Sequence, residues 1–372
     1  MKLVRLICLT GTSAVLLAIL STPSQAREHR QMWVTAYYAS WRNIPQPAEI
    51  DFSVITHLIY FTIFPTATGG LDPKNQGVTD STANALADAA HKAGRKVIIC
   101  IGGDGAGPAF RSAISAVNRA NFVSNIVDWV TSHHYDGVDI DFEPMQETDG
   151  PDFEAFSRDL RAALDKAQPG LLITAAVEGR GFPEIFAAVQ DDYDQINLMT
   201  YDMSGRWSTE TWYNSGLSNG GRLEKSTGKP LPSCELYAQK WEAGGVKSDK
   251  LGIGVCFSGR IFHGADGPNE PMDGVKIRGT NYARVLSIYA DSLYRWDDGA
   301  KSPYLSISST DKSQSMFVVY DDPRECAEKV KYVRGGDLGG LIVWEMSGDY
   351  LQNAPAGVDR QPLVTAIGQA VK

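Results

Sequence analysis

Short apolar runs alternate with longer amphipathic stretches along most of the chain. Eight runs of seven or eight residues are rich in β-branched and aromatic side chains, a composition that favours buried strands. They are WVTAYYA (33–39), VITHLIYF (54–61), KVIICIG (96–102), GVDIDFE (137–143), LLITAAV (171–177), QINLMTY (195–201), LGIGVCF (251–257) and GLIVWEM (340–346). These runs predict eight strands.

Helices, rather than hairpin turns, are expected to connect these strands. Helical periodicity covers residues 81–94, 109–133, 151–167 and 235–245. Apolar strands joined by helices are typical of a parallel sheet covered on its outer face. We therefore predict an α/β fold, a (β/α)8 TIM barrel, with its site at the carboxyl ends of the strands. An open doubly wound sheet is the alternative, but no glycine-rich phosphate loop opens an early helix.

One interval interrupts this alternation. Residues from about 260 to 321 separate the seventh strand from its helix, DPRECAEKVKYVRGG (322–336). This length predicts a small α+β insertion between strand 7 and its helix, forming a wall at one side of the barrel mouth.

The amino terminus has the pattern of a secretory signal. Lys2 and Arg5 precede an apolar stretch over residues 6–20, and the small-residue segment TPSQA follows. We expect residues 1–26 to be a signal peptide and 27–372 to be the folded domain, in a secreted or periplasmic protein. No later run reaches about 18 apolar residues, so no membrane span is expected.

The formal charge argues against two classes of partner. The net charge is −9, and it becomes −11 without the two basic residues of the signal. Nucleic acids and anionic membranes both favour an excess of Lys and Arg. We therefore expect a neutral substrate and neither a nucleic-acid nor a membrane partner. A monomer is expected, although the charge does not bear on the oligomeric state.

Four cysteines follow the expected signal. Cys100 and Cys256 lie in apolar strand runs and are interpreted as buried thiols. Cys234 and Cys326 could form one disulfide in an oxidising compartment, but the sequence does not establish it. None of the four has the spacing of a zinc site, and neither a metal nor another cofactor is expected.

The fourth strand carries a column of acids. Side chains alternate between the two faces of a strand, so Asp139, Asp141 and Glu143 share the inward face of a barrel, with Glu143 at the rim. Stacked carboxylates cannot all ionise at low cost, so one of them should hold a proton near neutral pH and serve as a general acid. Asp136 has the opposite parity and is expected to be structural.

Two simpler interpretations of this column are open. It could be a polar strand end paired with Lys or Arg from elsewhere in the chain. It could also be a calcium loop, although the glycine that such a loop needs at its sixth position is Pro144 here.

The segment DGVDIDFE resembles the D-x-x-D-x-D-x-E signature of glycoside hydrolase family 18, the chitinases and their relatives. Other strands carry similar matches in the family's order: KVIICIGG (96–103), LMTYD (198–202), LGIGVCFSGR (251–260) and GGLIVWEMSGDY (339–350). Together they cover nearly all of the chain after the signal.

The resemblance implies a catalytic domain and a role for each matching residue. Glu143 would protonate the glycosidic oxygen, and the carbonyl oxygen of the substrate's own 2-acetamido group would attack the anomeric carbon. Asp141 would orient that group and stabilise the oxazolinium ion, while Asp139 would tune Asp141. Tyr201 and Asp202 would bind the acetamido oxygen and the sugar. Two displacements imply retention of configuration.

The resemblance also implies residues that bind the sugar. Trp344 would form the floor beneath the sugar at the cleavage point, and Tyr37 would lie near the lower acids. Trp207 would line the cleft and Met199 would pack beside the site. Arg260 is a weaker match, and a salt bridge at the loop is its alternative role.

Three departures from the family pattern affect the substrate more than the chemistry. Cys100 replaces the family's serine, Ser258 replaces a tyrosine, and Pro144 follows the acid where an aromatic residue is common. A secreted chitinase that cleaves β-1,4 bonds between N-acetylglucosamine units is the leading hypothesis. An endo-β-N-acetylglucosaminidase acting on N-linked glycans and a non-catalytic lectin are the alternatives.

Overall fold

Eight parallel strands close into a barrel, as predicted. The computed structural model describes residues 31–288 and 291–372, so the expected signal peptide lies outside the described residues. Each strand pairs with the next, and the last pairs with the first. In order around the barrel they are β1 (Trp33–Ala39), β2 (His57–Pro65), β4 (Lys96–Gly103), β5 (Gly137–Phe142), β6 (Leu172–Glu178), β7 (Gln195–Met199), β8 (Leu251–Cys256) and β14 (Gly340–Trp344).

The strand boundaries differ from the prediction most clearly at β2, which covers His57–Pro65 rather than 54–61. Asp51 holds the preceding residues in a turn, because its carboxylate accepts the backbone N–H of Ser53 at 2.9 Å. A short antiparallel strand, β3 (Leu71–Asp72), extends the sheet beside the end of β2.

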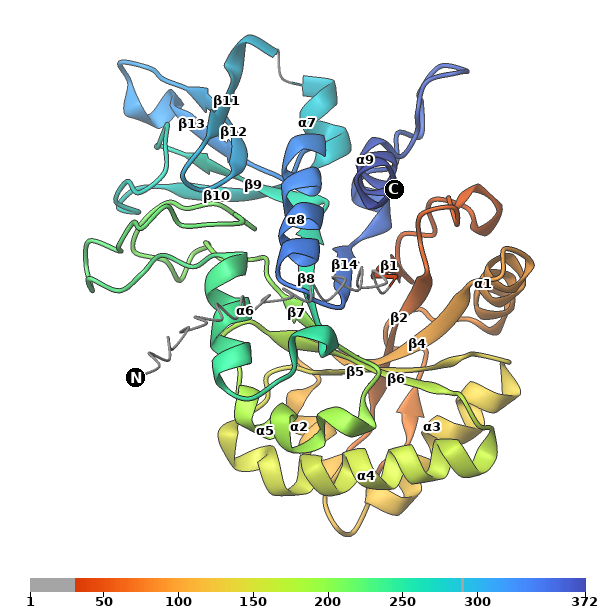
Figure 1. The fold of residues 1–372 in the computed structure, drawn as a ribbon. Helices are drawn as coiled ribbons and strands as arrows, with labels where there is room; N and C mark the ends of the chain where they lie inside the picture. The colour runs from red at the N-terminus through yellow and green to blue at the C-terminus, as the bar shows by residue number, and fades with distance from the viewer. Residues whose placement is uncertain (1–30, 289–290) are drawn as a thin grey trace, which may run out of the picture. The chain divides into compact units, whose positions relative to one another are not determined.

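Helices follow most of the barrel strands (Figure 1). They are α1 (Asp80–Lys92), α2 (Gly107–Ala113), α3 (Arg119–Ser132), α4 (Gly150–Ala167), α5 (Pro183–Val189), α6 (Cys234–Ala243), α8 (Pro323–Gly335) and α9 (Pro362–Val371). The single helix predicted over 109–133 is two helices. Side chains of Ser115 and Asn118 donate to the carbonyl of Ser112 and so replace backbone bonds at the end of α2.

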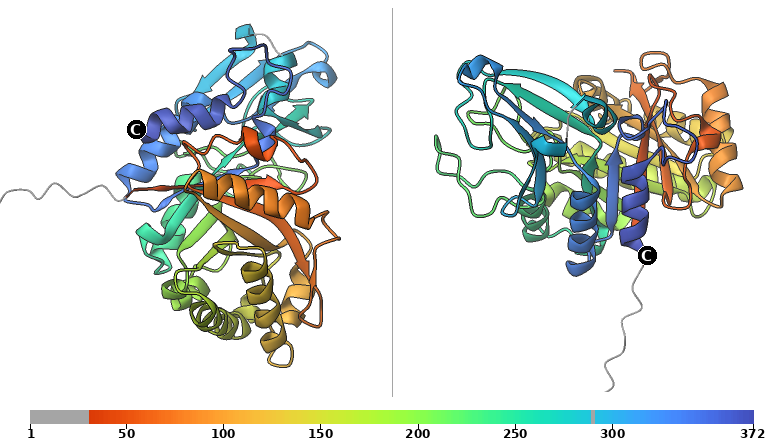
Figure 2. Two further views of the ribbon diagram at one scale, coloured as in Figure 1. Left: turned by 90° about the vertical axis from the view of Figure 1, so that its right-hand side faces the viewer. Right: turned by 90° about the horizontal axis from the view of Figure 1, so that it is seen from above.

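The predicted insertion is a second, antiparallel sheet between β8 and α8. Both views in Figure 2 place it to one side of the barrel strands. Its strands, in spatial order, are β10 (Lys276–Asn281), β9 (Ser258–His263), β13 (Met316–Val319), β12 (Ser302–Ile307) and β11 (Tyr294–Asp297), and α7 (Tyr282–Ile288) follows β10.

A buried charge cluster ties this insertion to the barrel. Lys329 of α8 is fully buried and lies 2.5 Å from Asp321 and 3.5 Å from Glu325. Asp321 accepts the backbone N–H of Cys256 in β8, and Glu325 accepts the hydroxyl of Ser302 in β12. One buried cation therefore compensates acids that contact both sheets.

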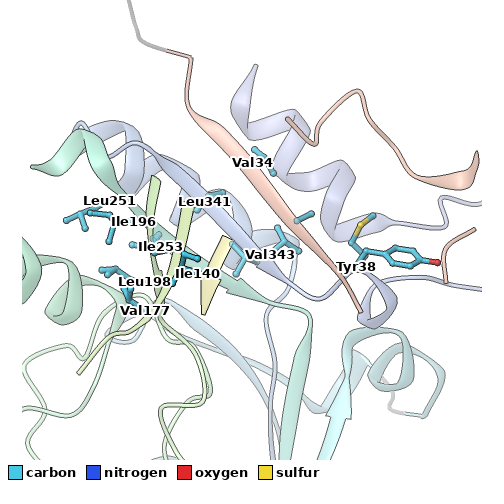
Figure 3. Close-up of a cluster of buried hydrophobic side chains, with 14 of the residues drawn as sticks. Val34, Tyr38, Ile140, Val177, Ile196, Leu198, Leu251, Ile253, Leu341 and Val343 are labelled. Carbon is cyan, nitrogen blue, oxygen red and sulfur yellow. The ribbon is translucent and has the colours of Figure 1, made fainter. Parts of the chain in front are cut away.

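The barrel strands bury both of their faces. Outward side chains such as Val34, Ile140 and Leu341 form the core between the barrel and its helices (Figure 3). Inward side chains such as Ile59 and Ile342 form a separate cluster inside the barrel. This two-sided burial explains why the strands are nearly continuous apolar runs.

The four cysteines of the described residues are all free and buried. Cys100 and Cys256 are buried thiols, as expected. The disulfide considered for Cys234 and Cys326 does not form in this structure.

Candidate active site

A cavity of about 570 Å³ opens at the carboxyl ends of the barrel strands. It lies at the end of the barrel where the fold class is expected to carry its site. Its lining consists of Tyr37, Trp41, Phe61, Thr62, Phe64, Gln76, Asp104, Asp141, Glu143, Ala176, Glu178, Gly179, Arg180, Met199, Tyr201, Asp202, Trp207, Tyr237 and Trp344.

Asp139 lies below the cavity floor, fully buried inside the barrel. Its carboxylate accepts hydrogen bonds from the hydroxyls of Tyr37 at 3.0 Å and Thr174 at 2.6 Å, and one from the Cys100 thiol. Burial raises the pKa of Asp139 to about 6, although these three donors oppose the increase.

Asp141 is one layer higher and is 2% exposed. Burial raises its pKa well above the ordinary value, and the charges of Glu143 and Asp139 raise it further. Its Oδ1 atom is buried and has no hydrogen-bond partner within the described part of the chain. A buried acceptor that faces a cavity without a donor is costly, and it is satisfied most simply by an N–H group of a ligand.

Glu143 stands at the rim, directly after β5. Burial raises its pKa to about 7, a hydrogen bond from Asp141 lowers it, and the nearby charges of Glu178 and Asp104 raise it. Both carboxyl groups of this pair therefore hold a proton at a higher pH than a free carboxyl group does. A carboxylic acid in this state can donate its proton to a bound substrate.

Aromatic rings form the floor around these acids. Trp344 meets Phe61 at 4.8 Å and Tyr37 at 5.6 Å, both edge to face, and stacks on Tyr201 at 6.4 Å. Gly254 leaves room for the Tyr201 ring, since a Cβ atom there would lie 2.6 Å from a ring carbon. The floor thus presents a fixed apolar surface beside the carboxyl groups.

Asp202, Trp207 and Arg260 form a group at the mouth. Asp202 has a left-handed backbone conformation, with φ of 53°, and its carboxylate is 2.6 Å from the Arg260 guanidinium. Arg260 also lies over the Trp207 ring at 5.2 Å and donates to the side chain of Asn214. Asp202 and Trp207 line the cavity and Arg260 does not, so Arg260 contacts the site through these two residues.

The cavity contains residues that the sequence analysis missed. Trp41, Asp104, Glu178 and Arg180 all line it. Glu178 ends the apolar run of β6 in the same way that Glu143 follows β5, so the signal that identified Glu143 could have identified it. The others lie in loops after strands, where no pattern marked them.

A sequence model matches most of the chain. The model described as "Glycosyl hydrolases family 18" covers residues 34–349. The chain belongs to glycosyl hydrolase family 18. Membership makes it a chitinase-like glycoside hydrolase.

Similar proteins have chitinase names. The chain is 28% identical to Chitinase 1 of Aphanocladium album over 84% of its own length and 80% of that protein. It is 27% identical to Endochitinase 1 of Metarhizium robertsii, over 89% of this chain and 86% of that one. The crystal structure of the Ostrinia furnacalis group IV chitinase in complex with allosamidin has the same fold. The TM-score is 0.78 and the identity 23%, over 91% of this chain and 98% of that one.

One of the departures from the family pattern, Cys100, contacts the acid column, and another, Ser258, lies in the second sheet. Cys100 replaces the family's serine and still donates a hydrogen bond to Asp139. Ser258 lies 2.9 Å from the Cys256 sulfur and starts the second sheet. The Cys100 substitution therefore leaves Asp139 with three hydrogen-bond donors.

Asp136 lies at the opposite end of β5 from the cavity. It accepts hydrogen bonds from Lys96 at 2.7 Å and from the backbone N–H of Val97 at 2.9 Å, and it lies 2.8 Å from His91. These contacts hold neighbouring strands together, which is a structural role.

Neither a membrane-spanning helix nor a cluster of metal ligands occurs in the described part of the chain. No helix within residues 31–288 and 291–372 is both long and apolar enough to cross a membrane. In the same residues, no group of three or more His, Cys, Asp and Glu side chains is arranged to hold a metal ion.

Proposed function

We propose that this chain hydrolyses the β-1,4 bonds of N-acetylglucosamine polymers, chitin or chito-oligosaccharides, with substrate-assisted retention of configuration. The buried, unpartnered Oδ1 of Asp141 below the rim carboxyl group of Glu143, both lining the cavity, is the observation that carries the proposal. An acetamido N–H is the donor this atom lacks, and N-acetylglucosamine supplies one next to its anomeric carbon.

Glu143 acts first, as the general acid. Its proton passes to the glycosidic oxygen while the bond from the anomeric carbon to that oxygen breaks and the leaving sugar departs. A pKa of about 7 keeps Glu143 protonated under mildly acidic conditions.

The substrate supplies the nucleophile. The carbonyl oxygen of its 2-acetamido group attacks the anomeric carbon as the leaving group departs, and a cyclic oxazolinium ion forms. Asp141 accepts the acetamido N–H and stabilises the positive charge, with Asp139 below it setting its proton affinity. Tyr201 donates to the acetamido oxygen.

Water completes the reaction. Glu143, now a carboxylate, takes a proton from a water molecule that attacks the anomeric carbon from the side that the leaving group vacated. The oxazolinium ring opens, and the acid is restored. Two inversions at one carbon give net retention.

The aromatic residues suit a sugar polymer. Trp344 forms the floor for the sugar at the cleavage point. Trp41 and Trp207 line the cavity yet remain 47% and 59% exposed, so they offer apolar faces on which further sugar rings can stack. Met199 packs against the inner cluster of the barrel that includes Trp344. Asp202 binds the sugar in the position that Arg260 holds for it.

The proposal includes export. The basic, apolar and small-residue segments of residues 1–26 have the order of a signal peptide, which would leave residues 27–372 as the mature catalytic domain, with its insertion over about 260–321. We infer a secreted or periplasmic monomer.

Product analysis tests the substrate. Purified protein is incubated in parallel with chito-oligosaccharides and with a high-mannose glycoprotein. We expect shortened oligosaccharides, formed first as the β-anomer, and no released glycan. Glycan release from the glycoprotein alone would replace this proposal with the endo-β-N-acetylglucosaminidase, and binding without hydrolysis would indicate a lectin.

A further inference from the structure

Three carboxyl groups lie in one row at the carboxyl ends of three adjacent strands. Gly102 of β4 is paired with Asp141 of β5, and Asp141 with Ala176 of β6. The residues two positions after Gly102, Asp141 and Ala176 are Asp104, Glu143 and Glu178, respectively. All three line the cavity, and the charges of Asp104 and Glu178 both act on Glu143. The general acid is thus flanked on both sides by a further carboxyl group.

The two flanking carboxyl groups are not neutralised by the protein. Both side chains are exposed, and neither makes an ion pair or a hydrogen bond with another side chain within residues 31–288 and 291–372. Arg180 is the cation that lines the cavity, and it attracts Glu178 only at longer range while donating to the hydroxyl of Tyr237. Negative charge beside Glu143 is left for a ligand to balance.

The unpartnered Oδ1 of Asp141 indicates the position of the sugar whose glycosidic bond is cut, and therefore that of the leaving sugar. It is buried one layer below the row and needs an N–H donor, so the sugar whose bond is cut must be N-acetylated there. Glu143 reaches the glycosidic oxygen, and the leaving sugar continues from that oxygen. The leaving sugar is therefore the one next to the row of carboxyl groups.

We infer that Asp104 and Glu178 make the site prefer a protonated glucosamine, rather than an N-acetylglucosamine, as the leaving sugar. The preferred substrate is then partially deacetylated chitin, cut between an acetylated unit and a deacetylated unit. This inference rests on the proposed function and adds a substrate class to it.

The size of the preference follows from exposed ion pairs. One such pair changes a rate or binding constant by a small factor, and two carboxylates around one ammonium group give roughly threefold to tenfold in kcat/KM. Because these carboxylate–ammonium pairs are in contact with water, salt at about 1 M should remove most of the preference.

The experiment compares two tetrasaccharides that differ in one acetyl group. Both are β-1,4-linked, and their units are numbered from the non-reducing end. All units are N-acetylated, except that the third unit of one substrate, the leaving sugar, carries a free amine. The rate of cleavage between the second and third units is read from product masses, at mildly acidic pH and at low and high salt. The readout is the ratio of the two kcat/KM values within each protein, so any general change in Glu143 cancels.

Four proteins are compared: the unaltered chain, Glu178→Gln, the double variant Asp104→Asn with Glu178→Gln, and Asp88→Asn. Asp88 is an exposed acid of α1 outside the cavity, and it controls for the lost negative charge. We expect the ratio to favour the amine in the unaltered chain and in Asp88→Asn, to fall in Glu178→Gln, and to approach one in the double variant.

The possible failures are distinct. Cleavage of the fully acetylated substrate without any preference for the amine, or a preference that persists in the double variant, would overturn this inference and leave the proposed function standing. Failure of the unaltered chain to cleave either substrate would overturn the proposed function itself.

Discussion

Replacing Asp139 by asparagine should make the free energy of unfolding less dependent on pH. Compared with the unaltered protein, the variant should be relatively more stable at alkaline pH than at acidic pH. The folded barrel holds this carboxyl group fully buried, and its pKa rises from 3.8 to about 6. A group with a raised pKa binds its proton more tightly in the folded state. Its contribution to stability is therefore present below about pH 4 and is lost as the pH rises through about 6.

The size of the effect follows from the two pKa values. A difference of one in pKa is about 1.4 kcal/mol, so the change from 3.8 to about 6 corresponds to about 3 kcal/mol. Ionisation of Asp139 alone should remove up to this amount from the free energy of unfolding between acidic and alkaline conditions. The Asp139→Asn side chain cannot ionise, so the variant should not lose this stability. Any cost of its weakened hydrogen bonds with Tyr37 and Thr174 to the free energy of unfolding is the same under acidic and alkaline conditions.

Urea unfolding at about pH 4.5 and about pH 8 measures this difference directly. The variant should gain about 2 kcal/mol on the unaltered protein between the two conditions, because about 1 kcal/mol is already lost at about pH 4.5. Asp88→Asn, the exposed control, should gain nothing. An equal difference between Asp139→Asn and the unaltered protein at both pH values would refute the reasoning, because Asp139 would then ionise as easily folded as unfolded.

Three further predictions concern other parts of the molecule. Lys329→Met leaves buried carboxyl groups without their cation and should lower the free energy of unfolding, measured in urea, by roughly 3 to 5 kcal/mol. Lys331→Met, at an exposed position on the same helix, should change it little. The kcat/KM for chito-oligosaccharides should fall as the pH rises through about 7, because Glu143 must be protonated, and a rate that still rises above that pH would contradict its role as the acid. Gly254→Ala should displace the Tyr201 ring and reduce kcat by roughly tenfold or more, with circular dichroism showing that the barrel persists.

The barrel could be predicted because its signal repeats. Buried parallel strands are apolar on both faces, so runs such as residues 96–102 are visible without any knowledge of their partners. The break between α2 and α3 was missed because it depends on Ser115 and Asn118 replacing backbone hydrogen bonds, which periodicity does not report.

The candidate site could be predicted only in part. Alternation along one strand placed Asp139, Asp141 and Glu143 on one face, since that geometry is local. The flanking acid Asp104 directly follows β4 and Glu178 ends β6, and only the register between strands brings them beside Glu143. The role of Arg260 could not be predicted for the same reason, because its ion pair with Asp202 joins residues that are far apart in the sequence.

Glu143→Gln tests the central claim most directly. Glutamine keeps the size of the side chain and removes the proton that the mechanism transfers to the glycosidic oxygen. Hydrolysis of a chito-oligosaccharide and binding of the same oligosaccharide, by calorimetry, are measured on the variant and the unaltered chain. The account predicts a fall in kcat of at least about a hundredfold with binding retained. A variant that hydrolyses the oligosaccharide at the unaltered rate would contradict it.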